Sequence, residues 1–188
     1  AIERDGKVPV EVASTGPKVI AIAARHADRV MFALGASPER IQWGMELARQ
    51  ARKDAGLDPN AIEFGSYVPC ASHPDLDTAR NLVRGGLTVA ARFAIMHGTA
   101  NGPISDKHEA VMQSLRSAYD MEKHTHGDSA QAAVLTPEFI DYYAVVGSPD
   151  TVTERLLALK TLGLSKIVVN GSWRDADDID GPQSKHLF

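Results

Sequence analysis

The sequence predicts an α/β fold built around a parallel sheet, and three observations support this prediction. Short apolar runs of strand length alternate with longer segments whose apolar residues recur at helical spacing. The turns between them are rich in Ser, Thr, Gly and Pro, which favour loops and helix starts. Residues 30–34 (VMFAL) are apolar throughout, which is typical of a strand buried on both faces of a parallel sheet.

Four strands are expected. In residues 8–13, Val8, Val10 and Val12 alternate with Pro9 and Glu11, as in a half-buried strand. The others are expected at residues 30–34, 62–68 and 166–170. Because helical segments separate the strands, the connections are expected to be right-handed βα units. Four such strands fit either a small open α/β sheet or half of a closed eight-stranded barrel.

Helices are expected between these strands, and three of them have the same start signal. A hydroxyl residue stands at the N-cap, Pro at the first helical position and an acid in the first turn, as in Ser37-Pro38-Glu39, Thr136-Pro137-Glu138 and Ser148-Pro149-Asp150. Gly56 and Gly163 are placed as C-terminal caps. The expected helices cover residues 18–27, 38–56, 75–97, 106–123 and 137–146, and a last one carries Val152, Leu156 and Leu159 on one stripe.

The chain of 188 residues and 20.2 kDa is long enough for one domain, which is expected to span residues 1–188. Residues 97–135, between the third and fourth strands, are expected to form a helical excursion with a flexible loop. The net charge of −4 shows no basic footprint for nucleic acid. Apolar runs of about five residues are far too short to span a membrane.

The single cysteine, Cys70, excludes an intrachain disulfide and suits a reducing compartment. The first ten residues contain no hydrophobic signal region. A soluble, cytoplasmic protein is therefore expected.

The turn after the first strand, Ser14-Thr15-Gly16-Pro17-Lys18, is the most informative candidate site. Gly16 allows a ligand to approach the backbone, and the free N–H groups and dipole of the following helix favour an anion such as phosphate. Alternatively, Thr15 caps the helix and Pro17 starts it, with no ligand involved. The spacing matches neither a Walker A motif nor the G-x-G-x-x-G fingerprint.

Gly35-Ala36-Ser37 follows the second strand at the same edge of the sheet, so this loop is placed to line the same pocket. The alternative is a plain N-cap at Ser37. At the other end of the strands, Glu11 and Glu63 share the face opposite the aliphatic side chains. Two carboxylates suit acid/base chemistry, but structural ion pairs are the favoured interpretation.

The remaining polar candidates indicate no defined chemistry. His124 and His126 lie in a polar turn without a zinc motif, and no metal site is expected. His97 and Asn101 belong to a glycine-rich loop, HGTANGP, which would suit a lid over a pocket. Cys70 is expected to be a small buried side chain.

Two segments, residues 9–35 (PVEVASTGPKVIAIAARHADRVMFALG) and residues 145–171 (VVGSPDTVTERLLALKTLGLSKIVVNG), resemble the luciferase-like monooxygenase superfamily of flavin- and deazaflavin-dependent oxidoreductases. The resemblance implies the C-terminal half of a (β/α)8 TIM barrel, with strands five to eight. It further implies hydride transfer with coenzyme F420, or FMN as second choice, on a small organic substrate. The residues implied in binding the phosphate-bearing tail of the cofactor are Ser14, Thr15, Gly16, Gly35 and Ala36.

The resemblance leaves several points open. It assigns no catalytic residue, and the four preceding βα units are absent. Ala36 stands where sugar-phosphate dehydrogenases of this family have lysine, which argues against a sugar-phosphate substrate. A half-barrel exposes two sheet edges, so the expected partner is a second copy or the missing N-terminal half. The rival interpretation is a non-catalytic half-barrel or dimerising interaction module.

Overall fold

The computed structural model describes residues 8–171 and contains a parallel sheet with β3 at its centre. Strand β3 (Glu63–Ser72) pairs through residues 63–66 with β2 (Arg29–Phe32), which pairs in turn with β1 (Glu11–Ser14). Residues 65–69 of β3 pair with β5 (Lys166–Asn170), and residues 70–72 pair with β4 (Val145–Gly147). All of these pairings are parallel, which confirms the predicted sheet type.

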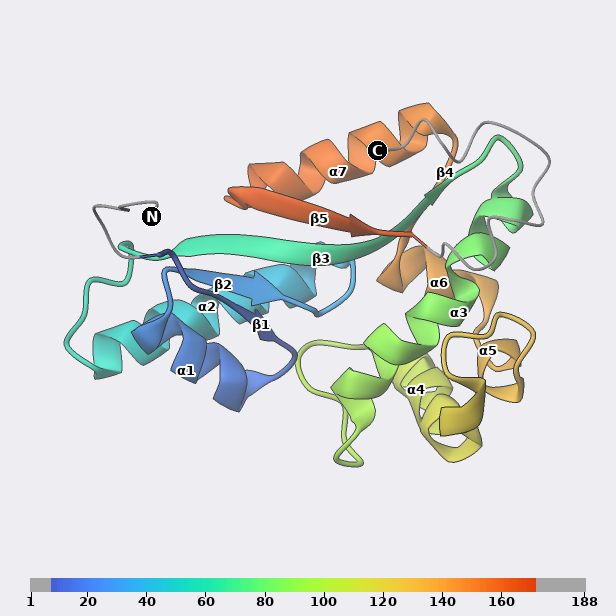
Figure 1. The fold of residues 1–188 in the computed structure, drawn as a ribbon, viewed down its shortest axis with the longest axis horizontal. Helices are drawn as coiled ribbons and strands as arrows, with labels where there is room; N and C mark the ends of the chain where they lie inside the picture. Colours follow the sequence, from blue (N-terminus) through green and yellow to red (C-terminus); the bar gives the residue numbers. More distant parts are fainter. Residues whose placement is uncertain (1–7, 172–188) are drawn as a thin grey trace, which may run out of the picture.

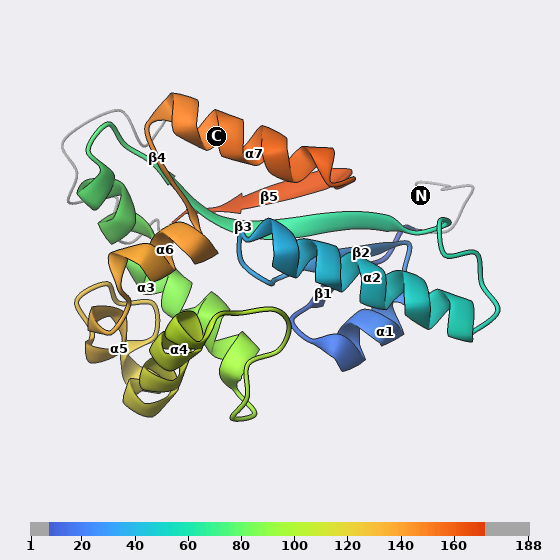
Figure 2. The same ribbon diagram turned by 180° about the vertical axis from the view of Figure 1, so that it is seen from behind.

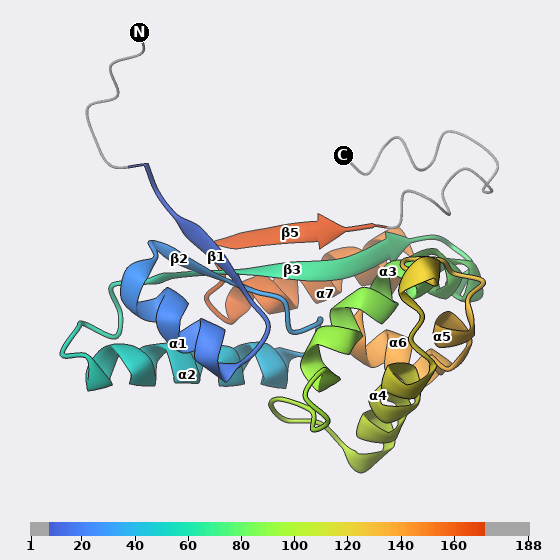
Figure 3. The same cartoon turned by 60° about the horizontal axis from the view of Figure 1, so that its bottom comes forward.

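Helices α1 (Pro17–His26), α2 (Pro38–Asp54) and α7 (Pro149–Thr161) cover one side of this sheet (Figures 1 and 3). Apolar side chains from these helices, such as Ile20 and Met45, pack on the strand residues Val30, Phe32 and Phe64. Burial of this aliphatic surface supplies the main stabilisation of the βα layer. On the other side of the sheet Figure 3 shows no helix formed by residues 8–171.

A second group of helices packs at the carboxyl end of β3 and against β4 (Figure 1). It contains α3 (Leu76–Ile95), α4 (Asp106–Ala118), the short helices η1 (Met121–Lys123) and α5 (Ala130–Ala133), and α6 (Pro137–Tyr143). Its core is separate from that of the first layer and is built around buried residues such as Leu87, Met112 and Phe139. These helices carry loops from distant parts of the chain to the carboxyl edge of the sheet.

The helix predicted over residues 137–146 is wrong at its end. Helix α6 stops at Tyr143, Ala144 is extended, and Val145–Gly147 form β4. Two consecutive β-branched valines favour an extended strand, and pairing with residues 70–72 supplies their backbone partners. The same pairing explains why β3 runs to Ser72, four residues beyond its predicted end.

The helix predicted over residues 106–123 is also too long. Helix α4 ends at Ala118, and Asp120 interrupts the helical pattern because its side chain accepts a hydrogen bond from the Glu122 backbone N–H at 2.8 Å. Local side-chain capping of this kind competes with helix continuation. A buried side chain, Gln131, holds the turn by accepting from the Asp120 backbone N–H at 2.6 Å.

Candidate functional site

The turn after β1 leaves a short accessible stretch at the carboxyl edge of the sheet. Ser14 ends β1 and is fully buried, and its hydroxyl donates to the Val12 carbonyl at 3.2 Å. Thr15 and Gly16 are only half-buried. The Thr15 hydroxyl has no hydrogen-bond partner among residues 8–171. Of the two hydroxyls in the predicted phosphate site, that of Thr15 is therefore the one available to a ligand.

Helix α1 begins immediately after this turn without a side-chain cap. Its N-cap is Gly16, so Thr15 does not cap the helix, whereas Pro17 starts it as the alternative interpretation expected. The hydroxyl of Ser37, the N-cap of α2, donates to the Glu39 carboxylate at 2.5 Å and does not cap its helix either. The other α-helices of residues 8–171 have a side-chain cap, from Asp75, Ser105, Ser129, Thr136 and Ser148. The two uncapped N-termini are those that follow β1 and β2, where the dipole and orphan N–H groups favour an anion.

Gly35 and Ala36 lie behind this edge, packed on Tyr143 at the end of α6. Gly35 has φ +83°, and a Cβ atom there would lie 2.7 Å from ring carbon Cδ1 of Tyr143. The Ala36 N–H donates to the Tyr143 carbonyl at 2.9 Å. Both residues are buried. Glycine is required at position 35 because the Tyr143 ring of this chain lies too close for a side chain there.

The glycine-rich loop between α3 and α4 reaches the turn from the other side. In both views it runs beside the connection from β1 to α1 (Figures 1 and 2). A Cβ atom on Gly16 would lie 3.2 Å from Nδ2 of Asn101, so the carboxamide of Asn101 packs directly on the turn. The fold thus joins Asn101, a residue of the loop predicted as a lid, to the predicted phosphate site.

Hydrogen bonds hold this loop in place along its length. The Gly98 carbonyl accepts from Gln113 Nε2 at 2.7 Å, and the Ala100 N–H donates to Glu109 Oε1 at 3.3 Å. The backbone N–H of Asn101 donates to the Ala94 carbonyl at 3.0 Å. These hydrogen bonds to α3 and α4 restrict the backbone flexibility that Gly98 and Gly102 would give to a lid.

Arg40 was not identified from the sequence. It connects the far end of the glycine-rich loop to the segment that follows β2. Its side chain is fully buried, with Nε donating to the Leu34 carbonyl at 2.9 Å and Nη1 to the Pro103 carbonyl at 3.1 Å. The guanidinium lies 5.5 Å from the centre of the Tyr143 ring. Arg40 Nη2 and Tyr143 Oη have no hydrogen-bond partner among residues 8–171. Burial raises the pKa of Tyr143, so this phenol stays neutral.

The predicted pair of acids lies at the opposite, amino-terminal edge of the sheet. Arg29 forms ion pairs with both Glu11 and Glu63, and Lys166 Nζ lies 2.8 Å from Glu11 Oε2. The hydrogen bond from Lys166 is the main cause of the lowered pKa of Glu11. Burial alone would lower the pKa of Arg29, but its contacts with Glu11 and Glu63 raise it. The favoured interpretation, structural ion pairs, is confirmed.

The other candidate residues have structural partners. Cys70 is buried, and burial raises its pKa to about 11, so its thiol is not poised as a nucleophile. His124 Nδ1 lies 2.9 Å from the Tyr119 hydroxyl.

Within residues 8–171 no group of three His, Cys, Asp or Glu side chains is arranged to hold a metal ion. Nor is any helix in this range long and apolar enough to cross a bilayer.

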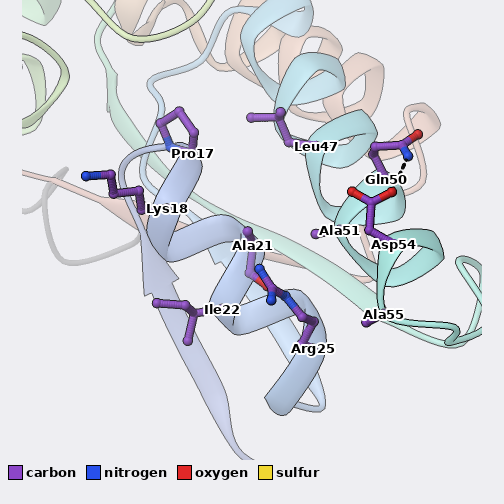
Figure 4. Close-up of a pocket in the computed structure, with 10 residues that line it drawn as sticks. All are labelled: Pro17, Lys18, Ala21, Ile22, Arg25, Leu47, Gln50, Ala51, Asp54 and Ala55. Carbon is purple, nitrogen blue, oxygen red and sulfur yellow. Dashed lines mark hydrogen bonds between the residues drawn. The ribbon is translucent and has the colours of Figure 1, made fainter.

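A groove with a volume of about 610 Å³ lies between α1 and α2 on the helical side of the sheet (Figure 4). Its apolar lining includes Ala21, Ile22 and Leu47, and its polar lining includes Arg25 and Asp54. All of its lining residues come from the two helices and the residue after α2. Two of these lining residues, Pro17 and Lys18, belong to the first turn of α1, whereas Thr15, Gly16 and Asn101 are not part of the lining.

The chain is similar in sequence to known proteins. The chain is 28% identical over 169 residues to 5,10-methylenetetrahydromethanopterin reductase of Archaeoglobus fulgidus, a match that covers 88% of this chain and 48% of that protein. The protein of the same name from Methanolobus tindarius is 22% identical over 168 residues, covering 87% and 48%. The chain thus spans about half the length of these relatives.

Two solved structures share the fold. The coenzyme F420-dependent tetrahydromethanopterin reductase of Methanopyrus kandleri superposes with a TM-score of 0.61 at 18% identity, over 86% of this chain and 44% of that one. An F420-dependent secondary alcohol dehydrogenase in complex with an F420–acetone adduct gives 0.60 at 19% identity, over 88% and 43%. The predicted α/β fold of a partial barrel is confirmed.

A sequence model of the luciferase-like monooxygenase family matches residues 2–166, which is most of the chain. The predicted resemblance is thereby confirmed, and the chain belongs to the luciferase-like monooxygenase family.

Proposed function

We propose that this chain forms the phosphate-binding part of the cofactor site in an F420-dependent oxidoreductase, with FMN as the second choice. The observation that carries the proposal is the uncapped N-terminus of α1, which begins at the accessible pair Thr15 and Gly16. This geometry suits an anionic group. The curated relatives are methylenetetrahydromethanopterin reductases, and both structures with the same fold are described as F420-dependent.

The residues present fit a phosphate-bearing tail. Thr15 offers a hydroxyl and the first turn of α1 offers N–H groups, and Gly16 between them carries no side chain that would meet the Asn101 carboxamide. Ser14 is buried and its carbonyl accepts from the Ala33 N–H at 2.9 Å, and the buried residues Gly35 and Ala36 follow in the same segment. The bound cofactor supplies the hydride chemistry on a small organic substrate, and the chain binds and orients it.

The side of the sheet opposite α1, α2 and α7 indicates a binding partner. No described helix covers this side, and Glu11, Ala13 and Lys166 are exposed on it. We propose that an N-terminal half-barrel, or a second copy of this chain, covers it in the active protein. A cytoplasmic location remains a prediction from the sequence. The rival function, a non-catalytic dimerising half-barrel, uses the same open side but needs no cofactor.

Fluorescence titration of the chain with F420 and with FMN distinguishes these functions. The proposal predicts saturable quenching by F420, weaker or absent quenching by FMN, and loss of F420 affinity in Thr15→Ala. Absence of quenching with both cofactors contradicts the proposal. Self-association without cofactor binding, measured by light scattering on the same sample, supports the rival.

A further inference from the structure

The loop that carries Asn101 contributes a polar group to the turn at Gly16. A Cβ atom added to Gly16 would lie 3.2 Å from Nδ2 of Asn101, which is closer than ordinary van der Waals contact. The carboxamide forms no hydrogen bond with any residue in the range 8–171. A half-buried amide without a partner lies beside an uncapped helix N-terminus and the free Thr15 hydroxyl. All three groups can donate hydrogen bonds.

Hydrogen bonds hold the backbone of the loop around Asn101 in place. The backbone groups of Gly98, Ala100 and Asn101 itself are bonded to α3 and α4, through Gln113, Glu109 and Ala94. Two residues beyond it, the Pro103 carbonyl accepts from Arg40 and, at 3.3 Å, from the Tyr142 hydroxyl. The backbone that carries the amide is therefore ordered before a ligand binds, which limits the conformational entropy lost on binding.

A buried charge at the base of the same loop indicates the sign of the ligand. Arg40 is fully buried, forms no ion pair with a carboxylate of residues 8–171, and retains an unpartnered Nη2. A buried cation without a counter-charge is costly. This positive charge lies at the Pro103 end of the loop, and like the dipole at the start of α1 it favours an anionic ligand over a cationic one.

We propose that Asn101 is an additional binding residue of this site, whose Nδ2 donates to a phosphate oxygen of the cofactor tail. The assignment rests on the proposed function and deepens it, because it adds a residue about 85 positions away in the sequence to the turn after β1. Thr15, the first-turn N–H groups of α1 and Asn101 then surround the phosphate from two sides.

The test compares F420 with its deazaflavin chromophore lacking the phosphate-bearing tail, by fluorescence titration of the full 188-residue chain. Asn101→Asp replaces the donor by a carboxylate and is expected to weaken F420 binding at least about tenfold, as for a lost hydrogen bond to a charged group. Asn101→Ala is expected to weaken it about fivefold. Neither variant is expected to change the affinity for the tail-less chromophore.

The matched control is Asn60→Asp, the same substitution at an exposed position that lies before β3. It is expected to leave F420 binding unchanged, and thermal unfolding shows whether each variant is folded. If the parent binds F420 and both Asn101 variants bind it equally well, the assignment of Asn101 is overturned while the proposed function stands. If the parent binds neither F420 nor FMN, both are overturned.

Discussion

The two edges of the sheet differ in how their polar groups are satisfied. At the amino-terminal edge, Glu11, Arg29, Glu63 and Lys166 neutralise one another in a network of ion pairs. At the carboxyl edge, two helix N-termini lack caps, and the Thr15 hydroxyl and Asn101 carboxamide have no partner among residues 8–171. Groups that satisfy one another stabilise a fold, whereas groups held in place without partners are available to a ligand.

The largest expected effect is a loss of stability. It should be greater for the buried Arg40 than for the partly exposed Arg29. Arg40→Ala removes a fully buried side chain and the charged donor of the Leu34 and Pro103 carbonyls, so we expect the free energy of unfolding to fall by about 3 to 5 kcal/mol. Arg29→Ala removes ion pairs that remain partly in water, and we expect a loss of about 1 kcal/mol. Urea denaturation measures both, and equal losses would refute the contrast between the edges.

The next effect tests the packing of Gly35 on Tyr143, behind the carboxyl edge. Gly35→Ala drives a Cβ atom into the Tyr143 ring and forces alanine to a positive φ, so we expect a loss of about 2 to 4 kcal/mol. The control is Gly56→Ala, which has φ +68° but no atom within 4 Å of the new Cβ. It should lose only about 1 kcal/mol. Similar losses in the two variants would show that backbone strain alone requires Gly35.

A smaller effect compares a capped helix with an uncapped one through the same substitution. The Thr136 hydroxyl accepts from the Phe139 N–H at 3.2 Å, so Thr136→Ala should destabilise the fold by about 1 kcal/mol. Thr15→Ala removes no such bond and should cost less than about 0.5 kcal/mol, while weakening F420 binding. Thermal unfolding and cofactor titration are measured on both variants. A reversed order of stabilities would contradict the helix-capping pattern.

The smallest effect is the pH dependence of the amino-terminal edge. The pKa of Glu11 is lowered from 4.5 in the folded chain, so its ion pairs contribute stability above the unfolded value and lose it as pH falls through the folded value. The melting temperatures of parent and Glu11→Gln are therefore expected to differ at pH 7 and to converge under strong acid. Glu46→Gln, which removes an exposed carboxylate of α2, is the control. A difference that persists unchanged in acid would contradict a role for the Glu11 charge.

Sequence periodicity was sufficient for most of the fold, because it reports which face of each element is buried. The four expected strands and the helices between them are present. Strand β4 was missed because Val145 and Val146 directly follow helix α6 without a turn signal, and their extended form depends on pairing with β3. That pairing is a tertiary contact that no local pattern contains.

The site could be predicted only in part for the same reason. The turn at Gly16 has a local signature, but its contact with Asn101 requires α3 and α4 to be placed first. Arg40 was overlooked because an arginine in an amphipathic helix is usually exposed. It precedes the buried residues Gly44 and Ala48 at intervals of four, so helical spacing was the signal that could have identified it.

The central claim, that the carboxyl edge binds the phosphate-bearing tail, is tested most directly by backbone amide chemical shifts during titration with F420. If the phosphate-bearing tail binds at this edge, the largest shifts occur at Thr15, Gly16 and Asn101, with little change at Arg29 and Glu63. Shifts confined to the groove between α1 and α2, or to the amino-terminal edge, would contradict it.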